Sequence, residues 1–342
     1  TAPRLEVDLD KIYHNALTLV ERLNERGISV TGVTKATLGS PEIANVWLQA
    51  GVIGLGDSRI ESIESMRRAR VAASMTLVRT PMRSQADQVV AFADVSCNSE
   101  LDVIRKLSSA AQKANCTHGI LLMVELGDLR EGIMPGDVES TVREVRRFPN
   151  LAFKGIGTNL ACRSGVSPDD QNMAELSALA DSIDATFGGI VSTVSGGNSA
   201  NLQWALGESD VGRVNNLRLG EAMLLGREPL HRKPIKGLHT DAITLVAEVI
   251  ESKRKPSKPW GEIAQAAFGE EAPRSDTGNI AQSILAIGRQ DTDPAGLAPP
   301  PGIEILAASS DHLVVDSSNC RDPLAVGAEI PFQLNYSALL RA

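Results

Sequence analysis

Tyrosine is scarce in this chain of 342 residues, which contains only Tyr13 and Tyr336. The chain also lacks an apolar run of the ~18 residues that a membrane span needs, and no signal-peptide pattern precedes Leu5. The net charge is −8 and there is no basic tract, which disfavours non-specific binding of nucleic acid. We therefore expect no membrane and no nucleic-acid partner.

The four cysteines (Cys97, Cys116, Cys162 and Cys320) are scattered. They show neither the CxxC spacing of a metal site nor the pattern of a disulfide framework. This usage is typical of a reducing cytoplasm, so we expect a cytoplasmic protein without a metal site.

Short apolar runs alternate with amphipathic segments over the first two thirds of the chain. Strict strand–helix alternation predicts an α/β fold, a (β/α)8 TIM-like barrel. A doubly wound open sheet is the alternative, because strand count alone does not show closure. The predicted strands are 29–34, 52–56, 75–79, 93–97, 119–125, 153–158, 190–195 and 214–218, and the predicted helices include 41–50, 58–69, 99–114, 136–147, 169–186 and 199–206.

The alternation stops near Gly226, and a mostly-β pattern follows. Proline and glycine cluster at 292–302, between the predicted strands. We therefore expect two domains, a barrel over 1–228 and a C-terminal β domain over 229–342. The predicted strands of the second domain are 244–250, 283–287, 303–307 and 313–315.

Two strand ends carry residues suited to an aldehyde and a phosphate. Lys35 follows the strand Val30–Val33, where a lysine can hold a cofactor aldehyde as a Schiff base, although most such lysines are simply solvated. In the run 195–199 (Ser-Gly-Gly-Asn-Ser), glycines allow close approach to an anion and Ser199 can cap the next helix. The same run also makes an ordinary loop. Together the two features suggest pyridoxal phosphate (PLP).

Six motifs in order carry a resemblance to a known family. They are Val33-Thr34-Lys35, Leu129-Arg130-Glu131-Gly132, Gly155-Ile156-Gly157-Thr158-Asn159, Ser195-Gly196-Gly197-Asn198-Ser199, Leu217-Arg218-Leu219-Gly220-Glu221 and Asn335-Tyr336-Ser337-Ala338-Leu339-Leu340. The chain resembles the fold-type III PLP enzymes of the alanine racemase family, and within it the ornithine racemase branch. The resemblance covers nearly the whole chain.

The resemblance implies roles for individual residues. Lys35 would form the Schiff base and act as one of two racemisation bases. Arg130 would lie near the phenolic oxygen of PLP, Arg218 would face the pyridine nitrogen, and Tyr336 would add a hydroxyl to the phosphate site. The cofactor-binding residues would be Lys35, Arg130, Asn159, Asn198, Ser199, Arg218, Gly220, Glu221 and Tyr336.

Arg218 distinguishes between reactions. An arginine is not deprotonated in proteins, so it can only donate to the ring nitrogen, which makes the ring a poorer electron sink. This favours racemisation over decarboxylation, because the related decarboxylases have glutamate at this position. Glu221 lies three residues on, so a shifted register is an alternative, and a salt bridge at the barrel end is another.

The resemblance also shows departures. Alanine racemases carry their second base, a tyrosine, in a Gly-Tyr-Ala-Asp motif, where this chain has Gly-Arg-Gln-Asp at 288–291. Arginine is implausible as a proton acceptor. Asp291 and Asp311 are the leading candidates for the second base, and His312 follows them. Each of the three could instead serve a turn or an interface.

Two other departures make alanine a poor first guess as substrate. Thr158-Asn159 stands where alanine racemases have a histidine that supports the arginine, and Gly39 replaces a tyrosine that contacts the phosphate.

The branch suggests a diamino acid such as ornithine or lysine. Its distal ammonium would need a carboxylate, for which Asp241, Glu262, Asp291 and Asp311 are candidates. If the second domain faces a neighbour's Lys35, the protein is a head-to-tail homodimer. The alternative functions are a fold-type III decarboxylase and a non-catalytic PLP carrier. The β domain argues against the carrier, because the known carriers of this fold are bare barrels.

Overall fold

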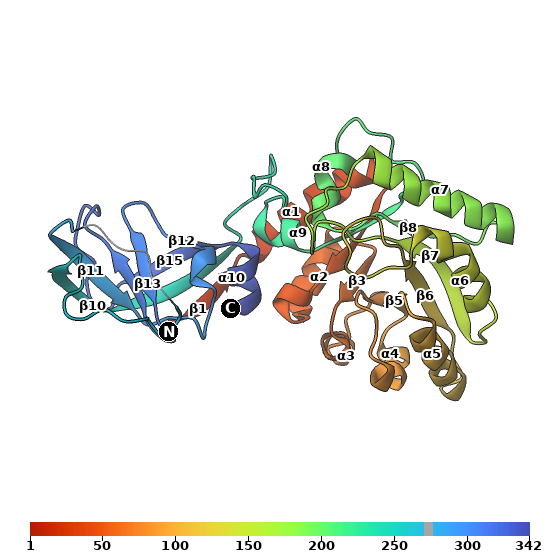
Figure 1. Ribbon diagram of the computed structural model, residues 1–342, viewed down its shortest axis with the longest axis horizontal. Helices are drawn as coiled ribbons and strands as arrows, with labels where there is room; N and C mark the ends of the chain where they lie inside the picture. The colour runs from red at the N-terminus through yellow and green to blue at the C-terminus, as the bar shows by residue number, and fades with distance from the viewer. Residues whose placement is uncertain (270–275) are drawn as a thin grey trace. The chain divides into compact units, whose positions relative to one another are not determined.

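The computed structural model describes residues 1–269 and 276–342 (Figure 1). The chain forms two compact units, a barrel unit (Leu9–Thr240) and a β unit (Thr1–Asp8 with Asp241–Ala342). The sequence predicted a boundary between residues 228 and 229. It therefore assigned residues 1–8 to the barrel and residues 229–240 to the β domain, whereas the structure has each of these segments in the other unit. The first residues belong to the β unit because strand β1 (Arg4–Val7) pairs antiparallel with β10 (Ile243–Pro256).

The barrel unit contains a closed parallel barrel of strands β2 to β9 (Figure 1). Closure is made by β2 and β9, which pair over Ser29–Gly32 and Asn216–Leu219, so the (β/α)8 prediction is confirmed and the open sheet is excluded. The strands are β2 (Ser29–Val33), β3 (Gly54–Asp57), β4 (Met75–Leu77), β5 (Val95–Asn98), β6 (His118–Met123), β7 (Leu151–Gly157), β8 (Thr193–Ser195) and β9 (Asn216–Leu219).

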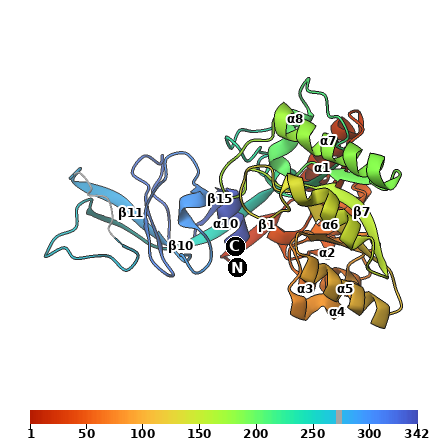
Figure 2. The ribbon, with the colours of Figure 1, turned by 45° about the vertical axis from the view of Figure 1, so that its right-hand side comes forward.

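Helices lie on the outside of the strands, as both views show (Figures 1 and 2). They are α1 (Leu9–Asn24), α2 (Pro41–Gln49), α3 (Ile60–Arg68), α4 (Ala86–Phe92), α5 (Leu101–Lys113), α6 (Val138–Val145), α7 (Asp170–Phe187), α8 (Leu202–Ala205) and α9 (Glu221–Leu225). Two single 3-10 turns stand at strand ends near the barrel mouth, η1 (Lys35–Thr37) and η4 (Ser199–Asn201).

Helix α2 shows how the sequence determines the first strand–helix unit. Ser40 caps the helix by accepting a hydrogen bond from the N–H of Ile43 at 3.4 Å, and Pro41 occupies the first helical position. Trp47, on the buried face of this helix, is fully buried. A Cβ on Gly32 of β2 would lie 2.7 Å from the Trp47 ring, so only glycine lets the helix pack this closely on the strand.

The β unit is built on one seven-stranded antiparallel sheet, in the order β12-β15-β10-β11-β14-β13, with β1 also paired to β10. Strands β10 and β11 form a long hairpin (Figure 2). The sequence did not predict β15, in which Pro331 takes one of the exposed positions, or the short helix α10. The further elements are β11 (Asn279–Leu285), β12 (Leu297–Ala298), β13 (Glu304–Ala308), β14 (Leu313–Asp316), β15 (Glu329–Leu334) and α10 (Tyr336–Arg341).

Within residues 1–269 and 276–342, no helix combines the length and apolar character of a membrane span. The same residues contain no group of three His, Cys, Asp or Glu side chains that could hold a metal ion. All four cysteines are free thiols.

Candidate active site

The carboxyl ends of the barrel strands gather the chemically relevant side chains at one mouth. All strands of a parallel barrel end on the same rim, which is where active sites of this architecture lie. The barrel unit brings to this rim most of the residues proposed from the sequence, namely Lys35 after β2, Arg130 after β6, Asn159 after β7, Asn198 and Ser199 after β8, and Arg218, Gly220 and Glu221 at the end of β9.

Lys35 is exposed at the rim, and the residues directly before it are buried. The preceding Thr34 is fully buried, and its hydroxyl donates to the Asp57 carboxylate at 2.8 Å. Burial raises the pKa of Asp57, and hydrogen bonds from the Arg59 N–H and Thr34 only partly offset it. The sequence did not point to Asp57, because its contact with Thr34 depends on the pairing of β2 with β3.

The positive charge of Lys35 acts on the carboxylate of Glu221. Burial raises the pKa of Glu221, while Arg232, at 2.8 Å from its carboxylate, and Lys35 lower it. The backbone of β9 comes close to the end of β2 at Gly220. A Cβ at this position would lie only 2.6 Å from the carbonyl oxygen of Val33, two residues before Lys35. The ends of β2 and β9 therefore meet through a position that favours glycine.

The loop after β8 forms a small polar cradle. Asn198 caps η4, its side-chain oxygen accepting from the N–H of Ala200 at 2.7 Å. Gly197 has φ +143°, and a Cβ there would lie 2.2 Å from the side-chain oxygen of Asn201. The buried hydroxyl of Ser199 accepts from the N–H of Ala222 at 3.2 Å and so joins η4 to the start of α9. Loops after the last two barrel strands are a recurrent place for phosphate.

Arg218 is a buried cation, 6% exposed, that is held by neutral acceptors. Its guanidinium donates to the Ser195 hydroxyl at 2.5 Å and to the Thr158 carbonyl at 2.6 Å. Within the part of the chain that the structure describes, it makes no ion pair with a carboxylate, which excludes the salt-bridge alternative. Burial lowers its pKa. The sequence did not identify Ser195 or the Thr158 carbonyl as its partners.

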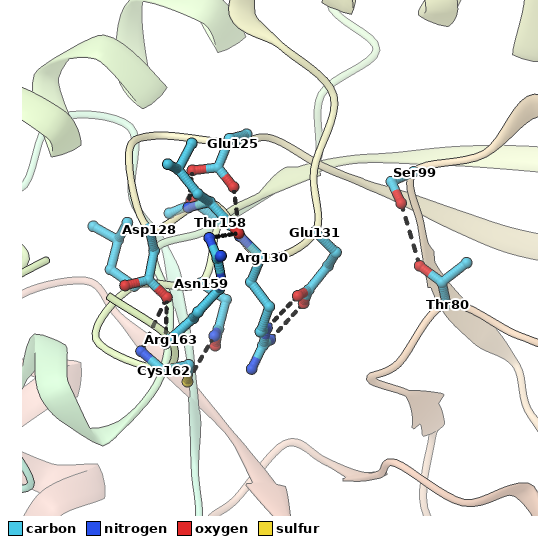
Figure 3. A network of polar contacts seen from close by, with 12 residues as sticks. Thr80, Ser99, Glu125, Asp128, Arg130, Glu131, Thr158, Asn159, Cys162 and Arg163 are labelled. Carbon is cyan, nitrogen blue, oxygen red and sulfur yellow. Dashed lines mark hydrogen bonds and ion pairs between the residues drawn. The ribbon is translucent and has the colours of Figure 1, made fainter. Parts of the chain in front are cut away.

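The loop after β6 is folded around Glu125. Its carboxylate accepts hydrogen bonds from the backbone N–H groups of Gly127 at 2.6 Å, Leu129 at 2.9 Å and Arg130 at 3.1 Å. The Arg130 side chain pairs with the carboxylate of its neighbour Glu131 (Figure 3). The backbone and the side chain of Arg130 are therefore fixed by two different carboxylates.

Asp128 ties this loop to the loop after β7 (Figure 3). Its buried carboxylate accepts from the backbone N–H groups of Cys162, Arg163, Ser164 and Val166, at 2.8 to 3.3 Å. Burial raises the pKa of Asp128, but these four hydrogen bonds outweigh it and the pKa is lowered. The loops that carry Arg130 and Asn159 are thus locked together.

Asn159 and Asn198 form a pair between the loops after β7 and β8. The Asn198 amide donates to the Asn159 side-chain oxygen at 3.0 Å, and the Asn159 amide donates to the thiol of Cys162 at 2.9 Å. Asn159 therefore supports the neighbouring loop, whereas Arg218 is supported by Ser195 and Thr158.

Gly39 departs from the family pattern for a steric reason. Its φ is +71°, and a Cβ there would lie 2.8 Å from the carbonyl oxygen of Ser62. The tyrosine expected from the resemblance would therefore strain this turn.

The comparisons with known proteins agree with this geometry. The family model described as "Alanine racemase, N-terminal domain" matches residues 7–228. The chain is 38% identical to ornithine racemase of Acetoanaerobium sticklandii over 99% of this chain and 96% of that protein. The chain belongs to the alanine racemase family.

One further relative and two solved structures extend the comparison. Lysine racemase of Thermotoga maritima is 36% identical over 99% of this chain and 95% of its own length. Among solved structures, alanine racemase from Streptomyces coelicolor A3(2) has a TM-score of 0.78 at 17% identity, covering 99% of this chain and 95% of that one. D-threonine aldolase from Filomicrobium marinum has a TM-score of 0.77 at 18% identity, covering 99% and 88%. These structures share the fold, which confirms the predicted barrel with a C-terminal β domain.

Enzymes of the alanine racemase family are in general PLP-dependent, and the residues of this barrel fit that group. The cradle of Gly197, Ser199 and Gly220 has the small residues and the hydroxyl that a phosphate needs. Arg218 is a buried donor without a carboxylate partner among the described residues, and Lys35 offers an exposed amine at the same rim.

The remaining candidates, Asp291, Asp311, His312 and Tyr336, belong to the β unit. Asp291 accepts from the N–H of Gly288 at 2.9 Å, which closes its own turn. Asp311 accepts from Nδ1 of His312 at 2.8 Å, and His312 is the leading cause of its lowered pKa.

Two backbone hydrogen bonds join the loops of Asp291 and Asp311, from Arg289 N to Ser309 O and from Gln290 N to Ser310 O, both 2.9 Å. The β unit therefore presents its candidate bases on adjacent loops. Tyr336 is half-buried at the first position of α10, behind the cap made by Asn335.

Proposed function

We propose that this chain is a PLP-dependent racemase of a basic diamino acid, with ornithine and lysine as the first candidates. The observation that carries the proposal is the barrel rim, which gathers Lys35, the Ser199 cradle and a buried Arg218 without a carboxylate partner among the described residues. The ornithine and lysine racemases that match over nearly the whole chain support the substrate class.

Five groups of the barrel unit would hold PLP. Lys35 would bind it covalently through its amine, Ser199 and the backbone near Gly220 would hold the phosphate, and Arg130 and Arg218 would contact the ring. When bound, PLP supplies an electron sink that stabilises negative charge at the substrate Cα.

Arg218 favours racemisation over decarboxylation. Its guanidinium stays protonated, so it can donate to the ring nitrogen but cannot give up a proton to it. Ser195 and the Thr158 carbonyl hold the guanidinium in place at 2.5 and 2.6 Å. Arg218 would therefore leave the ring nitrogen unprotonated, which would favour prompt return of a proton to Cα over loss of carbon dioxide.

Two bases on opposite faces of Cα would move that proton. Nζ of Lys35 would serve one face. The other would be served by the β unit, through Asp291, Asp311 or His312. The hydrogen bonds favour His312, because Asp311 orients its ring from Nδ1 as a carboxylate orients a catalytic histidine, whereas Asp291 is engaged in its own turn. Asp311 would then be a positioning residue.

We further propose that a second copy of the chain supplies this base, so that the enzyme is a head-to-tail homodimer. Sedimentation of the purified protein with PLP tests this point, with racemisation measured across the same range of protein concentrations. A monomer that racemises at full rate would contradict it.

The function is tested by incubating the purified protein and PLP with L-ornithine, L-lysine or L-alanine. We expect loss of optical rotation from the two diamino acids without release of carbon dioxide. Lys35→Ala should abolish it, whereas Lys106→Ala, on the outer helix α5, should not. Carbon dioxide release would indicate a decarboxylase. Binding of PLP without turnover of any amino acid would indicate a carrier.

A further inference from the structure

Arg130 and Arg218 place two positive charges at the barrel rim, and a carboxylate beside them has no role in the proposal above. This carboxylate is Glu131, which follows Arg130 directly in the chain. Neighbouring side chains in an extended segment point to opposite sides. Here the backbone turns, with φ +55° at Leu129 and +153° at Gly132, and both side chains point the same way (Figure 3).

The contact between the two side chains is a fork. Nε and one terminal nitrogen of Arg130 donate to the two carboxylate oxygens of Glu131. The exposed fractions of the two side chains are 39% and 26%. Two parallel charge-assisted hydrogen bonds fix both the position and the plane of a guanidinium, which a single contact does not. This separates the pair from the single-contact ion pairs on the outer helices.

Gly132 shows that the turn is required. A Cβ at this position would lie 2.4 Å from the backbone nitrogen of Glu125, so another residue type would displace the loop. Glu125 in turn holds the N–H of Arg130 at 3.1 Å. The loop therefore holds the backbone of Arg130 at the rim, and Glu131 holds its guanidinium.

Glu131 also acts on Arg218. Burial is the main cause that lowers the pKa of Arg218; the charge of Glu131 works against it and raises the pKa, while the charge of Arg130 lowers it further. Below them, Cys97, Leu121 and Met123 form an apolar cluster, and burial raises the pKa of the Cys97 thiol to about 11. Charges beside an apolar, water-poor region interact more strongly than charges in water. Glu131 is thus placed to balance the repulsion between two guanidinium groups.

We propose that Glu131 is a positioning residue, which holds the Arg130 guanidinium by a direct ion pair and balances the charge of Arg218 at the PLP site at longer range, without an ion pair to it. This inference rests on the proposed function. Glu131 touches neither substrate nor cofactor in this account; it acts through the two arginines.

The test uses Glu131→Gln, which keeps the shape and removes the charge. The matched control is Glu139→Gln, which removes a carboxylate paired with Arg143 on the outer helix α6. The first readout is the pH titration of the visible absorbance of the cofactor bound to Lys35. Loss of one negative charge makes the site more positive, so the titration should move to lower pH by roughly 0.5 to 1 unit in Glu131→Gln. The control should titrate as the wild type.

The second readout is a double-mutant cycle on kcat. Glu131→Gln should lower kcat by about tenfold to a hundredfold, because a misplaced guanidinium no longer fits the reacting geometry. If Glu131 acts mainly through Arg130, Glu131→Gln should lower kcat much less in the Arg130→Ala background than in the wild type. Glu131→Asp, which keeps the charge, should restore the wild-type titration in part.

The outcomes separate this inference from the proposed function. A wild-type protein that neither binds PLP nor racemises a diamino acid overturns both. A wild type that racemises, with Glu131→Gln unchanged in titration and kcat, overturns only the inference. Fully additive effects of the two substitutions would also overturn it, since Glu131 would then act independently of Arg130.

Discussion

The carboxylate of Asp128 offers the sharpest test of how the rim is assembled. Each of its oxygens accepts two backbone N–H groups, Ser164 and Val166 on one and Cys162 and Arg163 on the other. Asp128→Asn preserves the shape but leaves one oxygen. In either orientation of the amide, two N–H groups face an NH2 group that cannot accept.

The expected cost follows from these contacts. A hydrogen bond to a charged group contributes ~1.5–3 kcal/mol, so two lost bonds set an upper bound of ~3–6 kcal/mol. The loop lies at the rim and can relax toward water, so we expect a loss of ~2–3 kcal/mol in the free energy of unfolding. Racemisation should fall as well, because Arg130 and Asn159 lie on the two loops that Asp128 joins.

Urea unfolding at pH 7, followed by tryptophan fluorescence, measures this loss. Asp210→Asn is the control, because among the described residues the Asp210 carboxylate accepts one N–H, that of Gly212 at 2.9 Å, and an amide oxygen can replace it. An Asp128→Asn protein within ~0.5 kcal/mol of the wild type would refute the reasoning, because that is the range of an ordinary surface substitution.

The pH dependence of the same variant has a defined sign. Burial raises and backbone hydrogen bonds lower the pKa of Asp128, with a net lowering. The stabilisation is therefore fully present above the unfolded pKa, ~3.9, and is lost as the pH falls through the lower folded value. Asp128→Asn and the wild type should converge in acid. A difference that stays constant down to pH 2 would contradict this assignment.

Three further predictions concern other parts of the molecule. Burial lowers the pKa of His118 from 6.5 to about 4, so the free energy of unfolding should fall by up to ~3 kcal/mol as the pH drops from about 6.5 to about 4. His118→Gln should flatten this part of the urea-unfolding profile, and an unchanged slope would count against it. Gly39→Ala should cost ~1–3 kcal/mol, read as a lower Tm, because of its positive φ and the nearby Ser62 carbonyl. His312→Gln should block exchange of the Cα hydrogen from one enantiomer more than from the other, and Asp311→Asn should do so more weakly; equal loss from both enantiomers would exclude this base.

The barrel was predictable because its signal is local and repeated. Each buried strand is short and apolar, each helix is amphipathic, and the residues at the strand ends are polar, so alternation alone locates the rim. Lys35 and Arg218 stand at strand ends where the sequence predicted them. Closure was not predictable in this way, since it depends on the pairing of β2 with β9.

The partners of the site residues were not predictable, because they come from loops far apart in the chain. Ser195 meets Arg218 from the neighbouring strand β8, twenty-three residues earlier in the chain, and Asp128 accepts from N–H groups more than thirty residues away. Glu131 is adjacent to Arg130, but only the turn at Leu129 and Gly132 makes them face one another. The pairing of β1 within the β unit was not predictable for the same reason, because its partner β10 begins far along the chain, at residue 243.

Chemical trapping shows directly whether Lys35 carries PLP. The protein purified with PLP would be reduced with borohydride, digested, and its peptides weighed by mass spectrometry. We expect the phosphopyridoxyl group on the peptide that contains Lys35, and no labelled peptide from Lys35→Ala. A label on another lysine, or none in the wild type, would contradict the account.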